Sequence, residues 1–435
     1  MGKYTAYGKE VDSKIQSQLD SICKVIIKYL NPVSILLIGG FGRGEGSVIF
    51  KKGKFIPIND YDLYAITEKD YSSEVIEKMC TEASESIGKR CIDFHDYSKD
   101  MVYSIEKTFY PDIRVMTLNS LRKLPPFLKY YEIKYSSSVI YGKDILSQMP
   151  NFKITEVPNQ DGLRFLMNRL SLMIMHFSPK FIKNTSPSDR ERVINFNSKT
   201  ALSCAEALLL YSRKFVSSYG KRAEILEKTF SRDFPELAKK IPKLPKIIRK
   251  YTNQKIKPDY NSIKEYIQDW FDLRDYSLEI LNFLILKFTG KKAESPEELA
   301  KIMNIYYPMS YLKNYLKAKF NLKSNFLVSF LNPFANISLN LIYSRTLSSS
   351  TKRINLSPLL HPLSPPDMKI FPAAILIISS LNRDGTINSE LFLKSRKYLK
   401  QVYPDNPKIY DKLDWEEMRK TFGTAFNLYG FQRLI

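Results

Sequence analysis

The spacing of apolar residues in the first 150 positions changes repeatedly between helical and strand patterns. Helical spacing predicts helices over Val11–Leu30 and Ser72–Ile87. Short apolar runs predict strands, which lie at Val33–Ile38, in a hairpin within Ser47–Ile58, around Asp60–Tyr64, and at Arg90–Tyr97, Asp112–Leu118 and Val139–Gly142. We expect Arg90–Tyr97 and Asp112–Leu118 to pair with each other as a hairpin.

The pattern is helical beyond a polar, proline-bearing segment at Gln148–Gly162. Apolar residues on most faces predict buried helices over Leu163–Phe177 and Thr200–Ser218. Capping sequences predict helix starts at Ser262–Glu265, for a helix ending near Gly290, and at Ser295–Glu298 and Asp414–Glu417. The serine- and proline-rich stretch Leu356–Pro366 predicts a loop.

These patterns together predict an α+β protein. A small mixed-sheet domain over residues 1–150 precedes a large, mostly α-helical region, which we divide into residues 151–290 and 291–435. A chain of 435 residues is long enough to form two or three domains of ordinary size.

The net charge is strongly positive, with 67 Lys and Arg against 45 Asp and Glu, or +22. This balance favours polyanionic partners, although a general lysine bias explains it equally well. Two basic stretches, Lys239–Lys257 and Lys313–Lys323, are interleaved with Tyr251, Tyr315 and Phe320. The mixture of cations and rings is typical of nucleic-acid binding, and the alternative is a solvated helix face with extended lysines.

Four cysteines occur at positions 23, 80, 91 and 204, without the spacing of a zinc site or a disulfide framework. We therefore expect buried free thiols in a reducing compartment. No apolar run is long enough to span a membrane, and no signal sequence is visible, so we expect a soluble cytoplasmic protein without a membrane partner.

The candidate chemistry lies between Ser34 and Asp62. The predicted strand Val33–Ile38 ends in a glycine-rich turn, Gly39–Gly46, and glycines allow a ligand to approach the backbone closely. Asp60 and Asp62 follow after a spacer. Because alternate residues of a strand share a face, we expect both carboxylates to point the same way and to suit Mg²⁺ bound together with substrate phosphates.

This order of strand, Gly39-Gly40, spacer and Asp60-x-Asp62 resembles the nucleotidyltransferase superfamily of DNA polymerase β. It is most similar to the small stand-alone branch that includes the aminoglycoside and minimal nucleotidyltransferases. The similar stretch covers roughly residues 33–64. The resemblance implies a catalytic domain over residues 1–150, an acceptor domain over 151–290, NTP phosphates at Gly39 and Gly40, and Mg²⁺ or Mn²⁺ at Asp60 and Asp62.

One position departs from the family pattern, because Gly40 stands where the family usually has a serine that contacts phosphate. Arg43 and Ser47 are the candidates for the missing side-chain contact. The family also uses a third carboxylate on a later strand. We favour Asp112, because the run after it resembles the closing segment of this branch, over Asp93, which lies between two apolar residues.

The resemblance implies transfer of an NMP from an NTP, by default ATP, to a hydroxyl of a small molecule or a protein, with release of pyrophosphate. One alternative is an RNA 3′-end nucleotidyltransferase or RNA-binding protein that uses the two basic stretches. Another is a catalytically inactive nucleotide-binding regulator of a partner protein. Arg169 and His176 lie seven residues apart, similar to the Arg-spacer-His pattern of HEPN ribonucleases, but we favour a structural histidine.

Overall fold

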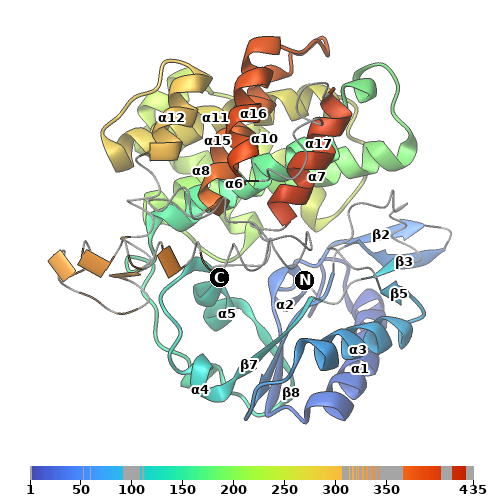
Figure 1. The fold of residues 1–435 in the computed structure, drawn as a ribbon. Helices are drawn as coiled ribbons and strands as arrows, with labels where there is room; N and C mark the ends of the chain where they lie inside the picture. The colour runs from blue at the N-terminus through green and yellow to red at the C-terminus, as the bar shows by residue number, and fades with distance from the viewer. Residues whose placement is uncertain are drawn as a thin grey trace.

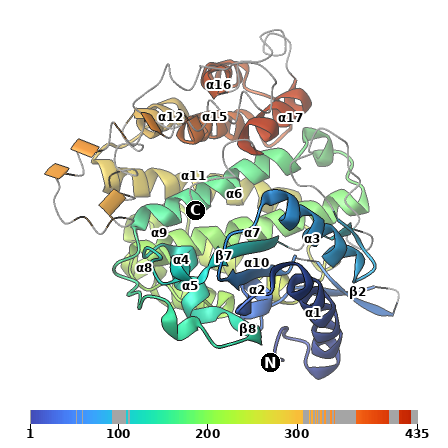
Figure 2. The same cartoon turned by 60° about the horizontal axis from the view of Figure 1, so that its bottom comes forward.

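The computed structural model describes residues 2–51, 53–58, 60–91, 108–109, 112–305, scattered positions between 313 and 341, 366–402 and 414–427. It has two parts, a small sheet with helices on both faces and a large helical region (Figures 1 and 2). The predicted α+β class is confirmed.

The central sheet has four strands in the order β7-β4-β1-β8. Its members are β1 (Ser34–Leu37), β4 (Asp62–Thr67), β7 (Asp112–Thr117) and β8 (Ser138–Gly142). Strand β1 is antiparallel to β4 and β8, whereas β4 is parallel to β7. The sheet is therefore mixed, and its parallel pair carries the candidate acids.

The predicted hairpin between Arg90–Tyr97 and Asp112–Leu118 is wrong for the residues that the structure describes. Strand β7 pairs with β4, while β5 (Arg90–Cys91) pairs in parallel with β6 (Thr108–Phe109). Both pairings join segments that are well separated in the sequence. The apolar patterns of the individual strands did not predict either pairing. The other predicted hairpin is confirmed by β2 (Val48–Lys51) and β3 (Lys54–Pro57).

Alternate residues of β1 and β4 enter two hydrophobic cores, one on each face of the sheet. On one face Ile35 and Leu37 pack beneath α1 (Lys9–Leu30) and α3 (Ser73–Glu85). On the other face Leu36 and Tyr64 pack with α4 (Leu118–Leu121) and α5 (Leu128–Ser136). The predicted helices over Val11–Leu30 and Ser72–Ile87 are confirmed. The glycine-rich turn contains a single helical turn, α2 (Gly39–Gly42).

The helical region shares one large core, in which Trp270 stacks on Phe177 with ring centroids 3.9 Å apart. Its described helices are α6 (Asn159–His176), α7 (Pro187–Tyr211), α8 (Tyr219–Asp233), α9 (Pro235–Lys240), α10 (Leu244–Ile256), α11 (Tyr266–Thr289), α12 (Pro296–Ile305), α15 (Pro366–Ser380), α16 (Ser389–Val402) and α17 (Trp415–Phe426). Helix α7 begins well before the predicted Thr200, because Ser186 caps it and Pro187 is its first residue.

Two of the three predicted caps are confirmed. The side chains of Ser295 and Asp414 accept hydrogen bonds from the N–H groups of Glu298 (3.2 Å) and Glu417 (2.9 Å). The predicted cap at Ser262 is wrong, because its hydroxyl instead donates to the Asp259 carbonyl in a turn and α11 begins at Tyr266.

The four cysteines are free; Cys91 is half-buried and the other three are buried. None of the helices in the described part of the chain combines the length and the apolar character needed to span a membrane.

Candidate active site

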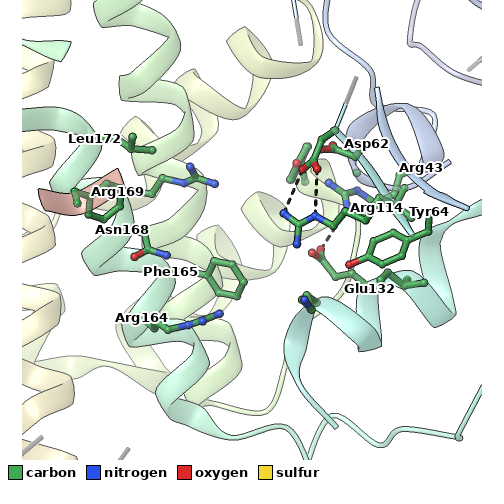
Figure 3. Close-up of a pocket in the computed structure, with 17 residues that line it drawn as sticks. Arg43, Asp62, Tyr64, Arg114, Glu132, Arg164, Phe165, Asn168, Arg169 and Leu172 are labelled. Carbon is green, nitrogen blue, oxygen red and sulfur yellow. Dashed lines mark hydrogen bonds and ion pairs between the residues drawn. The ribbon is translucent and has the colours of Figure 1, made fainter. Parts of the chain in front are cut away.

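Asp62 and Asp112 lie opposite one another at the first positions of the parallel strands β4 and β7. Tyr64 and Arg114 follow two residues later on the same strands and therefore share the same face. All four line one cavity (Figure 3). The guanidinium of Arg114 donates to both oxygens of Asp112 at 3.2 Å. The third-acid candidate that we favoured thus lies beside the acid motif.

Asp60 lies just before β4, because the strand begins at Asp62. The prediction that both motif acids belong to the strand is wrong, although their charges still interact. Burial raises the pKa of Asp60 to about 6, with a lowering effect from Lys199 and a further rise from Asp112. Burial, then the charges of Asp112 and Asp60, hold the pKa of Asp62 well above its usual range.

Within the described ranges, no three His, Cys, Asp or Glu side chains are grouped so as to hold a metal ion by themselves. The acids at the cavity therefore do not form a complete protein cage. This matters for the choice of metal, because Mg²⁺ usually takes only one or two carboxylates from the protein and completes its shell with water and substrate phosphates.

Gly39 lines the cavity directly beside Asp62. Its φ of +66° lies in the left-handed region that favours glycine, and a Cβ at this position would be only 2.2 Å from Oδ2 of Asp62. Two independent constraints therefore require glycine here, and its backbone lies against the carboxylate.

Gly40 is not among the residues that line the cavity. A Cβ there would be 3.2 Å from the carbonyl oxygen of Glu45, and the N–H of Glu45 donates to the Gly40 carbonyl at 2.8 Å. The turn is thus closed tightly on itself at the position where the family pattern has serine.

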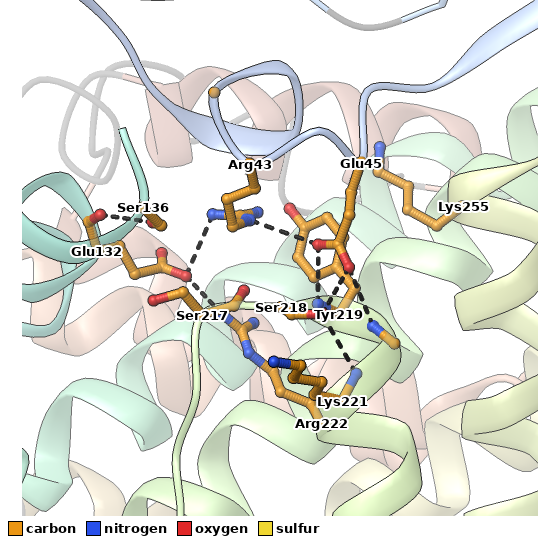
Figure 4. A network of polar contacts seen from close by, with 12 residues as sticks. Arg43, Glu45, Glu132, Ser136, Ser217, Ser218, Tyr219, Lys221, Arg222 and Lys255 are labelled. Atoms are coloured by element: carbon orange, nitrogen blue, oxygen red, sulfur yellow. Dashed lines mark hydrogen bonds and ion pairs between the residues drawn. The ribbon is translucent and has the colours of Figure 1, made fainter. Parts of the chain in front are cut away.

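Arg43 also lines the cavity, but its guanidinium is engaged by acids. It lies 3.3 Å from Oε1 of Glu132 and 3.6 Å from Oε2 of Glu45, over the ring of Tyr219 at 4.3 Å (Figure 4). Glu45 in turn accepts hydrogen bonds from Ser218 Oγ, Tyr219 N and Gly220 N at 2.7, 2.9 and 3.2 Å. These contacts attach the glycine-rich turn to the N-terminus of α8.

Ser47 is buried and does not line the cavity. Its hydroxyl donates to the carbonyl of Lys255, on α10, at 2.5 Å. A neighbouring contact also joins the two parts of the chain. Arg222 of α8 is fully buried, and its guanidinium donates to Glu132 and Glu206. The structure therefore brings Arg43 and Ser47 to the junction with the helical region.

The cavity has a volume of about 340 Å³ and lies between this face of the sheet and α6. From α6 it is lined by side chains that sequence reasoning did not single out together, namely Arg164, Phe165, Asn168, Arg169 and Leu172 (Figure 3). Their spacing places them on one face of the helix. The sequence feature that could have identified this face is the set of polar residues on one side of an otherwise buried helix.

Two lysines accompany the site. Lys129 of α5 lines the cavity, and burial together with the charges of Arg114 and Arg164 lowers its pKa to about 7. Lys255 is buried, and burial holds its pKa well below the ordinary range despite the charges of Asp62 and Asp60. Arg114 was predictable as the residue two positions after Asp112, whereas Lys129 and Lys255 had no distinguishing pattern.

Of the basic stretch Lys239–Lys257, much is already engaged within the fold. Arg249 pairs with Glu227 at 2.6 Å, and Lys250 pairs with Asp269 at 2.6 Å. The ring of Tyr251 is buried and so is not available for base stacking. Most of Lys313–Lys323, including Tyr315, lies outside the described residues.

His176 is stacked on Phe196 with centroids 3.9 Å apart, and burial holds its pKa well below the usual range. Unlike Arg169, it does not line the cavity, which agrees with the structural role that we favoured. Asp93 lies outside the described residues.

Comparison with family models, curated proteins and solved structures gave no match to this chain.

Proposed function

We propose that this protein is a metal-dependent nucleotidyltransferase that moves an NMP group from an NTP to a hydroxyl acceptor. The observation that carries the proposal is the pair Asp62 and Asp112, opposite one another on parallel strands at a cavity lined by Gly39. The same cavity has Arg164 and Arg169 on its other wall, and these cations suit phosphates.

A divalent cation fits the acids of this site. Asp62 and Asp112 offer hard oxygen donors side by side, with Asp60 close enough to affect the pKa of Asp62. Burial and mutual repulsion raise the pKa values of Asp60 and Asp62, and a bound cation would remove that cost. Mg²⁺ or Mn²⁺ held by these residues would neutralise charge on the phosphates and on the leaving group.

The protein's own residues orient the reaction. Gly39 permits close approach of the phosphates, since it has no side chain between the backbone and Asp62. In the proposed step the acceptor oxygen bonds to the α-phosphorus, the bond from the α-phosphorus to the bridging oxygen breaks, and pyrophosphate leaves. Asp112, whose carboxylate Arg114 holds in place, would either share the cation or accept the hydroxyl proton as base.

The test is calorimetric titration of the protein with each of the four NTPs, with and without Mg²⁺. We expect at least one NTP to bind in a metal-dependent manner and Asp62→Asn to abolish that dependence. The matched control is Asp70→Asn, which changes an exposed aspartate outside the cavity. The absence of metal-dependent binding for all four NTPs, or its full retention in Asp62→Asn, would contradict the proposal.

A further inference from the structure

The family resemblance implies a side chain that contacts a substrate phosphate from the glycine-rich turn, and this turn has none. Gly40 replaces the expected serine. Arg43 is engaged by Glu132 and Glu45, and Ser47 donates to the Lys255 carbonyl away from the cavity. Each of the three positions is therefore either without a side chain or already committed to the junction with the helical region.

The opposite wall of the cavity carries two arginines, Arg164 and Arg169, whose Nε atoms have no hydrogen-bond partner and which form no ion pair with a described acid. Arg164 is only 8% exposed and Arg169 is half-buried, and the Nε atom of each is buried without a hydrogen-bond partner. Among the described residues, neither has an acid within ion-pair distance. Figure 3 shows both side chains extending from α6 toward the cavity. A buried guanidinium without an anion is costly, so a site that retains one is suited to a ligand that supplies the anion.

The charges around these arginines also favour an anionic ligand. Arg43 and Arg114 also line the cavity but are paired with Glu132 and Asp112, respectively. The charge of Arg164 opposes the rise that burial causes in the pKa of Asp161, whose Oδ2 accepts the N–H of Leu128 at 2.8 Å. Lys129 of α5 also lines the cavity, where Arg114 and Arg164 act on it as like charges. The α6 side of the cavity thus carries two arginines that no described acid pairs at contact distance, while Asp161 and Glu206 act on them from farther away.

We propose that Arg164 and Arg169 of α6, together with Lys129 of α5, form a phosphate-binding subsite across the cavity from Asp62. The planar fork of a guanidinium matches two oxygens of one phosphate group, which a lysine ammonium does not. The subsite takes over the contact that the glycine-rich turn lacks. The subsite itself stands on the cavity geometry, and only the source of its phosphate rests on the proposed function.

Two sources have the required chemistry, the triphosphate of the NTP and a phosphate group on the acceptor. In either case the positive charges on this wall favour an anionic group and disfavour a polycationic acceptor. The probe for the subsite is therefore inorganic pyrophosphate in the absence of metal, which tests the anion contacts without involving the acids or any turnover.

The experiment is calorimetric titration of the full chain with pyrophosphate, using wild type, Arg164→Gln, Arg169→Gln and the control Arg232→Gln. Arg232 is an arginine of α8 whose side chain is 70% exposed and paired with a neighbouring aspartate. We expect each cavity variant to weaken binding about 10- to 100-fold, as loss of a charge-assisted hydrogen bond does, and the control to bind like wild type. Equal affinity of all four proteins, or no binding to wild type, would overturn the subsite.

Arg164→Lys keeps the charge and the packing of the aliphatic part of the side chain. It therefore provides a second test of position 164 if Arg164→Gln does not fold. We expect it to bind more weakly than wild type and more tightly than Arg164→Gln. Thermal unfolding of each variant checks its fold before titration. If Arg164→Lys bound like wild type and Arg164→Gln did not fold, the bidentate contact would be wrong.

A competition titration identifies the source of the phosphate. If saturating NTP with Mg²⁺ removes pyrophosphate binding, the subsite holds the triphosphate; if pyrophosphate still binds, it holds a phosphate of the acceptor. Under both outcomes, pyrophosphate binding depends on Arg164 and Arg169. Failure of the proposed function has a different signature. Either no NTP would bind in a metal-dependent manner, in which case the competition has no competitor, or Asp62→Asn would leave NTP binding unchanged, while in both cases the arginine variants still weakened pyrophosphate binding.

Discussion

Position 39 of the turn favours glycine for two reasons, the backbone conformation and the close approach of the neighbouring acid. We expect Gly39→Ala to cost about 1–2 kcal/mol for the left-handed φ and more for displacing Asp62. Gly53→Ala is the matched control, because Gly53 has a φ of +73° but open space around its Cβ position. Urea unfolding compares the two.

The same pair of variants separates structure from function. Gly39→Ala should also abolish metal-dependent NTP binding, whereas Gly53→Ala should leave it intact. If both variants lost the same stability and kept NTP binding, the close contact between Gly39 and Asp62 would have no functional meaning.

Asp60 gives a pH dependence whose sign can be worked out. Its pKa is about 6 in the folded protein, above the ordinary value of 3.8. The protonated form therefore contributes stability that is fully present below about pH 4 and is lost as the pH rises through about 6. Without metal, Asp60→Asn should be more stable than wild type at pH 8 by about 1–2 kcal/mol, discounted for partial solvent contact, and the difference should be less than half as large at pH 4.5.

Urea unfolding at pH 4.5 and pH 8, without metal, measures this difference. Asp70→Asn is the control, since Asp70 is exposed. A variant less stable than wild type at pH 8 would show that Asp60 is stabilised as a carboxylate and that the site needs no cation.

At the scale of elements, the junction between the glycine-rich turn and α8 depends on Glu45. Its carboxylate accepts two backbone N–H groups in the first turn of α8, where unpaired N–H groups favour negative charge. Glu45→Gln keeps the shape but removes the charge, and we expect a loss of about 1–3 kcal/mol in the free energy of unfolding.

Glu224→Gln is the control for Glu45→Gln, because Glu224 lies on the same helix with a side chain 53% exposed and forms only an (i, i+4) pair with Lys228. Surface pairs of this kind contribute little, so its effect should stay within about 0.5 kcal/mol. Equal losses in the two variants, measured by urea unfolding, would mean that Glu45 does not hold the turn against α8.

The elements that were predictable from sequence are those specified by local patterns. Apolar spacing gave α1 and α3, the apolar run gave β1, and Ser295 and Asp414 gave two helix starts. The pairing of β7 with β4 was missed because strand pairing is non-local and leaves no mark in either strand. Ser262 failed as a cap because the same residue types also close ordinary turns.

The candidate site divides in the same way. Gly39 and Asp62 were found because a short spacing carried them, and Asp112 because the run after it resembles the closing segment of the family branch; the structure brings all three to one cavity. Arg164, Arg169 and Lys129 come from helices that only the tertiary fold places opposite the sheet. Arg43 and Ser47 were read as phosphate contacts, whereas their described partners are Glu132, Glu45 and the Lys255 carbonyl.

At the scale of the whole molecule, the cavity belongs to neither part alone. The sheet supplies the acids and Gly39, α6 supplies the arginines, and the contacts of Glu45 and Arg222 hold the two parts together. This arrangement suits a reaction in which one wall holds the cation and the other holds phosphate. If α6 binds the phosphate as we propose, the glycine-rich turn needs no phosphate-binding side chain of its own.

The central claim is transfer of the α-phosphoryl group with release of pyrophosphate. The most direct measurement follows label from α-³²P and γ-³²P forms of the NTP that binds, with Mg²⁺ and a cellular extract as the source of acceptors. We predict that α-label enters an acceptor while γ-label appears as pyrophosphate, and that Asp62→Asn abolishes both. Transfer of γ-label to the acceptor, or equal transfer by Asp62→Asn, would contradict the account.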